Sequence, residues 1–188
     1  MLTQQQPAPP TRYRWTRQQY EQMIEAGVFD EDARVELIHG EVVTMRPQSS
    51  RHATIVTLVA EALRSAIGEG WYVREQLPLA LDPDSEPEPD LAVVAGAPLD
   101  YFHAHPTTAL LVVEVADSSR RKDRTEKVAL YGRHGIREYW LFDLVEYKLI
   151  VHRQPEQDGY AERLMLTPAD SVTAPETSAP IPVRDMLP

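Results

Sequence analysis

The feature that most constrains the fold is the apolar run from Ala109 to Val115, which contains a single charged residue, Glu114. A continuous apolar run of this length, bounded by polar segments, is typical of a strand buried at the centre of a sheet. Side chains alternate along a strand, so Glu114 is expected on the same face as Leu110 and Val112. A carboxylate there needs a cation or hydrogen-bond donors to offset its desolvation. The alternative, commoner for a lone Glu, is exposure at the strand end.

Helix and strand signals alternate along the rest of the chain, which predicts a mixed α/β (α+β) sheet flanked by helices. Thr16 is expected to cap a helix through Ala26 that stops at Gly27, and Ser50 to cap a helix to Ile67. His39-Gly40 is expected to join the strands 34–38 and 41–45 as a hairpin. A helix is predicted over 123–134, and a loop with little chance of ladder pairing over 82–89. Strands are predicted over 71–76, 91–94, 138–142, 147–153 and 160–166, and residues 181–187 are expected to dock on the domain.

Composition excludes several classes of protein. The 188 residues are 43% hydrophobic and 26% charged, which is typical of one globular domain. We expect a flexible tail over 1–11 and a single domain over 12–188. The absence of cysteine excludes disulfides and thiolate metal sites. No apolar stretch approaches the roughly 20 residues of a membrane span, and the Gln- and Pro-rich start lacks the core of a signal peptide, so a cytoplasmic location is expected.

Charge is distributed unevenly. The net charge of −10 argues against tight nonspecific binding to DNA. However, residues 120–137 contain seven basic residues against two acidic ones, whereas residues 82–90 contain five acidic residues and no basic one. A basic tract beside an acidic segment suits a cation-dependent enzyme acting on phosphates, and two solvated surface segments are an equally good interpretation.

A second acid strengthens the functional interpretation of Glu114. Asp90 stands where the acidic loop becomes the next predicted strand. If the two strands are neighbours, their carboxylates lie side by side and repel each other unless a cation is bound. Hard oxygen ligands without a Cys or His cluster favour Mg²⁺, with Mn²⁺ as an alternative. Lys127, on the following helix, is a candidate to stabilise developing negative charge.

These residues resemble the PD-(D/E)XK nuclease superfamily, and the chain over about residues 13–187 resembles its Uma-type restriction endonuclease family. The resemblance rests on Val35–Glu41, His52, Pro89-Asp90-Leu91, Val112–Val115 and, most specifically, the long block Asp123–Asp143. It implies a restriction-endonuclease-like fold in which Asp90, Glu114 and the backbone carbonyl of Val115 bind the metal. The lysine expected two residues after Glu114 is replaced by Ala116, and the resemblance implies that Lys127 takes its role.

Other candidates are less specific. Glu36 and His52 are implied to complete the site, although a surface Glu and a structural His are alternatives. Glu75 is a weaker candidate acid. Asp123 could orient Lys127, cap its helix or form a surface pair with it. Tyr131, one turn beyond Lys127, points the same way but is expected to be a packing residue, like Tyr139 and Trp140. Arg120, Arg121 and Lys122 are either DNA-backbone contacts or an exposed loop.

The sequence therefore predicts a Mg²⁺-dependent endonuclease that cleaves DNA and forms a homodimer, the dimer being an analogy with nucleases of this type. Two alternatives stay open: a binding or regulatory protein that keeps the nuclease fold without activity, and a nuclease acting on RNA or single strands. A serine hydrolase and a phosphate-binding Gly-rich loop are excluded, because neither Gly-x-Ser-x-Gly nor a Gly-rich loop is present.

Overall fold

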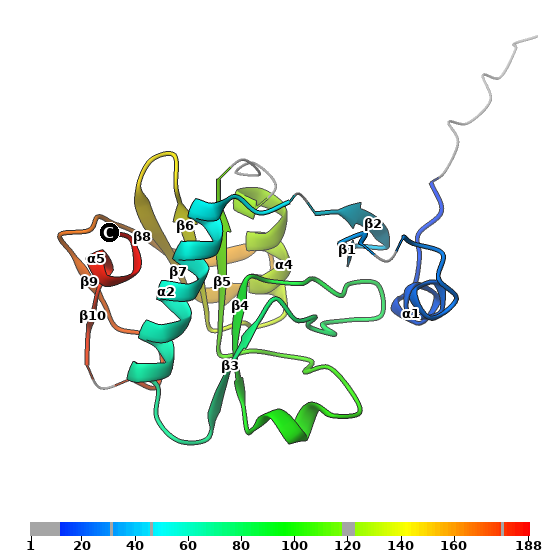
Figure 1. The fold of residues 1–188 in the computed structure, drawn as a ribbon, viewed down its shortest axis with the longest axis horizontal. Coiled ribbons are helices and arrows are strands. Elements are labelled where there is room, and N and C mark those ends of the chain that lie inside the picture. The colour runs from blue at the N-terminus through cyan, green and yellow to red at the C-terminus, as the bar shows by residue number, and fades with distance from the viewer. Residues whose placement is uncertain (1–11, 31, 46, 118–122, 178) are drawn as a thin grey trace, which may run out of the picture.

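The computed structural model describes residues 12–30, 32–45, 47–117, 123–177 and 179–188, with only the backbone of residues 123 and 124. A six-stranded sheet in the order β3-β4-β5-β6-β7-β8 forms its centre (Figure 1). Only β5 and β6 pair in parallel, and the other neighbours are antiparallel. The strands are β3 (Trp71–Glu75), β4 (Leu91–Ala95), β5 (Leu111–Ala116), β6 (Glu138–Asp143), β7 (Lys148–Glu156) and β8 (Gly159–Leu166). The predicted mixed sheet is confirmed.

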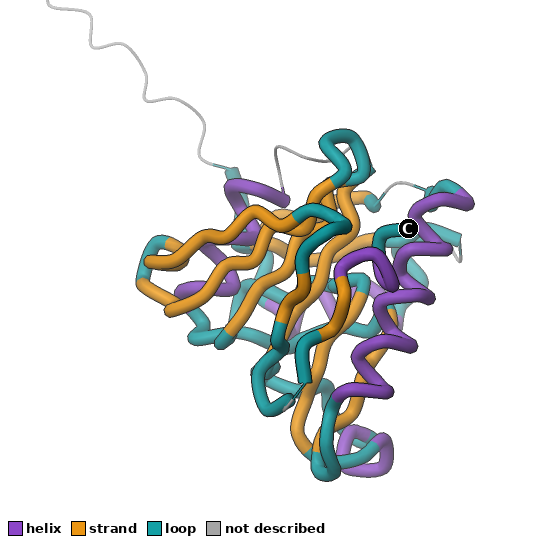
Figure 2. Tube along the Cα trace, turned by 90° about the vertical axis from the view of Figure 1, so that its left-hand side faces the viewer, coloured by secondary structure: helices purple, strands orange, loops and turns teal. Residues whose placement is uncertain are grey.

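Helices cover both faces of this sheet. The long helix α2 (Ser50–Ala66) and the short α5 (Val183–Met186) pack on one face, and α4 (Val128–Arg133) packs on the other (Figures 1 and 2). Each face has its own apolar cluster, so every residue of β5 and β6 is buried. Full burial on both faces explains why these two strands read as nearly continuous apolar runs.

The amino-terminal elements form a separate layer beside the sheet. Helix α1 (Arg17–Glu25) starts at Thr16, whose side chain accepts from Gln19 N in a capping box. Strands β1 (Val35–Ile38) and β2 (Glu41–Thr44) form the predicted hairpin. Both turn residues, His39 and Gly40, have positive φ, as the two-residue turn requires.

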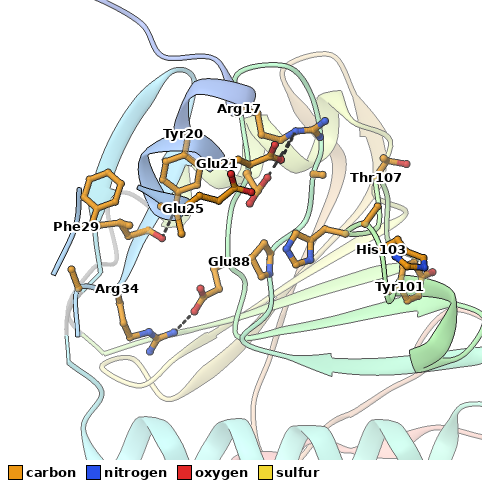
Figure 3. A pocket seen from close by; sticks show the side chains of 18 of the residues that line it. Arg17, Tyr20, Glu21, Glu25, Phe29, Arg34, Glu88, Tyr101, His103 and Thr107 are labelled. Atoms are coloured by element: carbon orange, nitrogen blue, oxygen red, sulfur yellow. Dashed lines mark hydrogen bonds and ion pairs between the residues drawn. The ribbon is translucent and has the colours of Figure 1, made fainter. Parts of the chain in front are cut away.

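The acidic segment crosses from this layer to the sheet. Leu37 and Glu86 form an isolated antiparallel bridge, with Glu86 N donating to Leu37 O at 2.8 Å. The expected loop over 82–89 is confirmed, because these residues form no strand and pair only through isolated bridges. A cavity lies between α1 and the loop that follows the 3₁₀ turn η1 (Pro98–Tyr101) (Figure 3).

Several boundaries differ from the predictions. Ser49, not Ser50, caps α2, because its Oγ is the atom that accepts from His52 N. The helix expected over 123–134 begins as a π-helical turn η2 (Asp123–Lys127) before α4, and such turns are frequent at functional sites. The chain end forms a small sheet of β9 (Ser171–Val172) and β10 (Ile181–Pro182) that the sequence did not indicate.

None of the helices in the described parts of the chain is both long and apolar enough to cross a membrane.

Candidate active site

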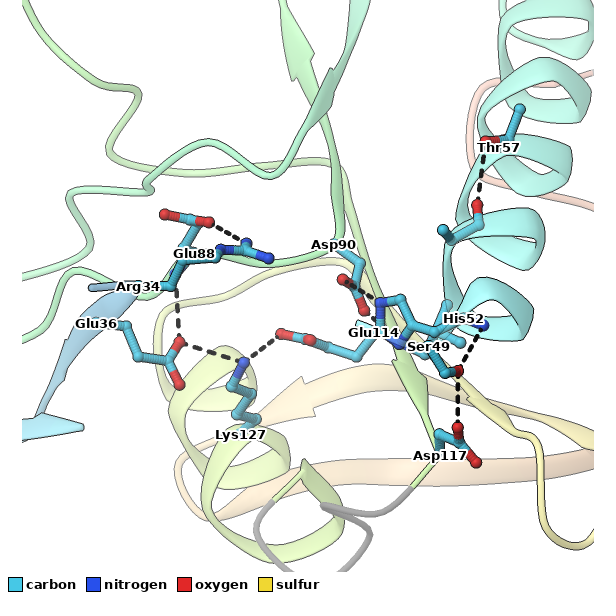
Figure 4. Close-up of polar contacts among 12 residues, drawn as sticks. Arg34, Glu36, Ser49, His52, Thr57, Glu88, Asp90, Glu114, Asp117 and Lys127 are labelled. Carbon is cyan, nitrogen blue, oxygen red and sulfur yellow. Dashed lines mark hydrogen bonds and ion pairs between the residues drawn. The ribbon is translucent and has the colours of Figure 1, made fainter. Parts of the chain in front are cut away.

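Asp90 and Glu114 come from neighbouring strands. Strands β4 and β5 pair antiparallel with Leu91 opposite Val113, and continuing that register by one residue sets Asp90 opposite Glu114. Opposite residues of an antiparallel pair point to the same face of the sheet. Asp90 and Glu114 are only 6% and 5% exposed, so the two carboxylates are buried neighbours (Figure 4). The alternative of a solvated Glu at the strand end is wrong.

Two donors hold Asp90 from opposite sides. Val115 N donates to Asp90 Oδ2 at 2.8 Å, which ties the carboxylate to the strand that bears Glu114. His52 Nε2 lies 2.9 Å from Asp90 Oδ1 and reaches it from the first turn of α2 (Figure 4). The Ser49 cap orients this turn, and its Oγ also donates to Asp117 at 2.9 Å. The structure therefore brings His52 into contact with the first candidate acid.

Lys127 connects the second acid to the hairpin. Its Nζ lies 2.7 Å from Glu114 Oε1 and 3.3 Å from Glu36 Oε2, and its side chain is 4% exposed (Figure 4). Glu36 comes from β1, and its Oε2 also accepts from the backbone N–H of Glu88 at 3.3 Å. One buried ammonium group thus joins carboxylates from two separate sheets. The structure brings Lys127, Glu36 and Glu114 together, although nearly 80 residues separate Glu36 from Glu114.

Tyr131 is the contact that the sequence analysis missed. Its phenolic O–H donates to Glu114 Oε1 at 3.0 Å, the same oxygen that accepts from Lys127. The residue is fully buried, as expected for packing, and its ring lies 5.2 Å from that of Tyr139. Its spacing of four residues from Lys127 placed it on the same helix face. That spacing indicated that Tyr131 points toward the candidate site, but its hydrogen bond to Glu114 was not predicted.

Other sequence candidates lie elsewhere or outside the described residues. Glu75 forms an ion pair with Arg64 and its side chain is 40% exposed, so the structure does not bring it to the site. Trp140 packs in the core, and its indole N–H donates to Glu138. Arg120, Arg121, Lys122 and the side chain of Asp123 lie outside the described residues.

Comparisons with known proteins show which family the chain belongs to and which fold it shares. The profile of the Uma2 family, described as "Putative restriction endonuclease", matches residues 17–180.

The chain belongs to the Uma2 family.

A solved structure matches the fold of this Uma2 family member. It is described as a putative nuclease belonging to DUF820 from Anabaena variabilis, and the two folds superpose with a TM-score of 0.69 at 17% sequence identity. The match covers 85% of this chain and 92% of that protein, and at this identity it shows the fold. No curated protein matches the sequence.

The donor set of this Uma2 family member fits a hard divalent cation. Asp90 and Glu114 offer carboxylate oxygens, which are the hard ligands that Mg²⁺ prefers, from adjacent positions on neighbouring strands. Among the described residues no three His, Asp or Glu side chains converge as a metal site. The backbone carbonyl of Val115 as a further ligand stays a prediction.

Proposed function

We propose that the protein is a Mg²⁺-dependent endonuclease that hydrolyses phosphodiester bonds in DNA. The observation that carries the proposal is the pairing of Asp90 with Glu114 across β4 and β5, with Lys127 bound to Glu114. Family membership supports a nuclease function, and nuclease activity implies a nucleic-acid substrate. The metal, the DNA substrate and the individual roles are inferences from the chemistry of the residues.

Asp90, Glu114 and the carbonyl of Val115 would bind the metal. A bound Mg²⁺, or Mn²⁺, supplies Lewis-acid polarisation of the phosphate and a lower pKa for the attacking water. The two acids are held in place before any ligand arrives, because Asp90 is fixed by His52 and Val115 N, and Glu114 by Lys127. Such preorganisation is the main contribution that a protein makes to this kind of electrostatic catalysis.

Lys127 is the proposed catalytic cation. Its ammonium group lies between Glu114 and Glu36, where it can position water and stabilise charge that develops on the phosphate. It also accounts for Ala116 in this chain, since that small buried residue lies on β5 and the ammonium group comes from η2 instead. Glu36, His52 and Tyr131 act through these residues as positioning groups.

Plasmid nicking tests the proposal. We expect the wild-type protein to nick supercoiled DNA in Mg²⁺ or Mn²⁺ and to stop in EDTA. Asp90→Asn should lose activity, whereas the matched control Asp158→Asn, in an exposed turn, should not. Titration calorimetry with Mn²⁺ gives a second readout, in which Glu114→Gln should weaken binding. A folded wild-type protein that neither binds Mn²⁺ nor nicks DNA would favour a binding or regulatory role instead.

Substrate and assembly are tested in the same preparation. Parallel reactions on duplex DNA, single-stranded DNA and RNA separate the proposed substrate from its alternatives. We propose a homodimer because cleavage of both strands of a duplex requires two sites, and sedimentation equilibrium at several concentrations measures this directly. Phosphate contacts by Arg120, Arg121 and Lys122 are tested by replacing all three with Ser and following the salt dependence of DNA binding.

A further inference from the structure

A cavity of about 990 Å³ adjoins the candidate active site without being part of it. It lies between α1, the start of β1, the segment that contains Glu86 and Glu88, and the loop after η1 (Figure 3). Arg34 and Glu88 form an ion pair that lines this cavity, and the same pair appears beside Glu36 in the view of the active site (Figures 3 and 4). The two sites thus share one wall.

The lining of the cavity carries an excess of negative charge. Two guanidinium groups, Arg17 and Arg34, face five carboxyl groups, those of Glu21, Glu25, Asp30, Glu86 and Glu88. Burial lowers the pKa of His105, so this lining residue is neutral at pH 7 and does not offset the acids. An anionic ligand such as a phosphate would be repelled from these walls.

Glu86 is the most unusual of these acids. It is 5% exposed, and its Oε2 accepts no hydrogen bond from an N–H group or a hydroxyl among the described residues, although its carboxyl group also forms a side-chain hydrogen bond with that of Glu21. The nearest cation is Arg17, whose Nε is 3.9 Å from Glu86 Oε2 and 3.4 Å from Glu21 Oε1. Burial, followed by the nearby charge of Glu21, raises the pKa of Glu86 to about 7. A buried carboxyl group in this state is stabilised by any further donor that brings positive charge.

Aromatic rings supply the rest of the wall. Tyr20 and Phe29 lie with ring centroids 6.2 Å apart, and Phe102 stands 76% exposed among the lining residues of the loop after η1. The ring of Tyr101, also in the lining, is already covered by the guanidinium of Arg74 at 5.3 Å. Aromatic faces combined with carboxylates are a typical environment for organic cations.

We propose that this cavity binds an organic cation, a ligand with a guanidinium or ammonium group on an apolar stem, at Glu86 and Glu21. A metal ion would leave the aromatic part of the wall without a ligand. The cation is either a free amine or an Arg or Lys side chain of a protein partner, since both present the same group. The proposal is independent of nuclease activity.

Titration calorimetry with agmatine, in EDTA to exclude metal binding at the candidate active site, tests the proposal. We expect saturable binding to the wild-type protein and none for N-butylurea, which has a similar shape without the charge. Glu86→Gln should weaken binding by about tenfold or more, as expected for the loss of a charge-assisted hydrogen bond. Glu21→Gln should also weaken it, and the exposed control Glu61→Gln on α2 should not.

The outcomes separate the sources of the cation. Tighter binding of agmatine than of an Arg-containing peptide indicates a free amine, and the reverse order indicates a protein partner. Absence of saturable agmatine binding, or equal binding by the wild-type protein and both cavity variants, overturns the proposal. Circular dichroism shows whether Glu86→Gln is folded, and Glu21→Gln, whose side chain is 48% exposed, provides the test if it is not.

Discussion

Replacement of Lys127 by Met tests the candidate site most directly. The Lys127 side chain is 4% exposed, and its Nζ contacts carboxylates at 2.7 and 3.3 Å. Met keeps most of the stem volume but removes the ammonium group, which leaves Glu114 and Glu36 as buried acids that repel each other. Removing one partner of a buried ion pair costs about 3–5 kcal/mol of unfolding free energy.

The size of the chain converts this cost into a measurable shift. For a domain of this length each kcal/mol corresponds to about 2–4 °C in Tm, so Lys127→Met should melt about 6–20 °C below the wild-type protein. Urea denaturation followed by circular dichroism measures the free energy. The matched control is Lys148→Met, because Lys148 is 37% exposed and 3.7 Å from Glu146, and such surface pairs contribute below about 1 kcal/mol.

A double variant separates stability from activity. Adding Glu36→Gln to Lys127→Met removes one of the two repelling carboxylates, so part of the lost stability should return. Nicking should stay about 10²–10³ lower in both variants, because the cation proposed to stabilise the transition state is still missing. If Lys127→Met unfolds at the same urea concentration as the wild-type protein and nicks DNA equally fast, both the buried pair and its catalytic role are refuted.

Three further predictions follow from other contacts. Tyr131→Phe removes only the hydroxyl that donates to Glu114, and should lower the unfolding free energy by about 1.5–3 kcal/mol in urea denaturation; an unchanged midpoint contradicts that bond. Gly132→Ala would place its Cβ 2.0 Å from Gly159 O, so we expect the unfolding free energy in urea to fall by about 1–3 kcal/mol. An unchanged unfolding free energy would show that the backbone at Gly159 moves away without cost. Burial raises the pKa of Glu86 from 4.5 to about 7. Between these two pH values the folded protein holds a proton on Glu86 that the unfolded chain has released, so the contribution of Glu86 to the unfolding free energy falls as pH rises from 4.5 to about 7. The difference in unfolding free energy between the wild-type protein and Glu86→Gln should therefore change between pH 4.5 and about 7. A difference that stays constant over this pH range contradicts the raised pKa of Glu86.

Local sequence signals predicted those elements whose causes are local. Thr16 caps α1 through contacts within three residues, and His39-Gly40 closes the hairpin through its own backbone conformation. The apolar run of β5 predicted a buried central strand because burial on both faces leaves few polar positions. Boundaries were less accurate, as with Ser49 and the π-helical turn, because one residue's difference hardly changes the local pattern.

The candidate site was predictable only in part. Asp90 and Glu114 were found because an acid at the edge of an apolar strand is unusual, and the family resemblance indicated Lys127 and Glu36. The expectation that Tyr131 is a packing residue is confirmed by its full burial, but its hydrogen bond to Glu114 was not predicted. A buried tyrosine has the same sequence pattern whether or not its hydroxyl donates to a buried acid. Glu75 was considered as a weaker candidate acid because its ion pair with Arg64 depends on how α2 lies beside β3, which the sequence does not indicate.

The sequence by itself determined which segments form the six strands of the central sheet, which residues are acids in apolar surroundings, and which family the chain resembles. The tertiary structure decided which of those acids meet. The register of β4 against β5 sets Asp90 beside Glu114, and the packing of α4 and the hairpin brings Lys127 to Glu36. The physical reason is that local signals act over a few residues, whereas the pairing of buried charges depends on strand register and layer packing between segments far apart in the chain.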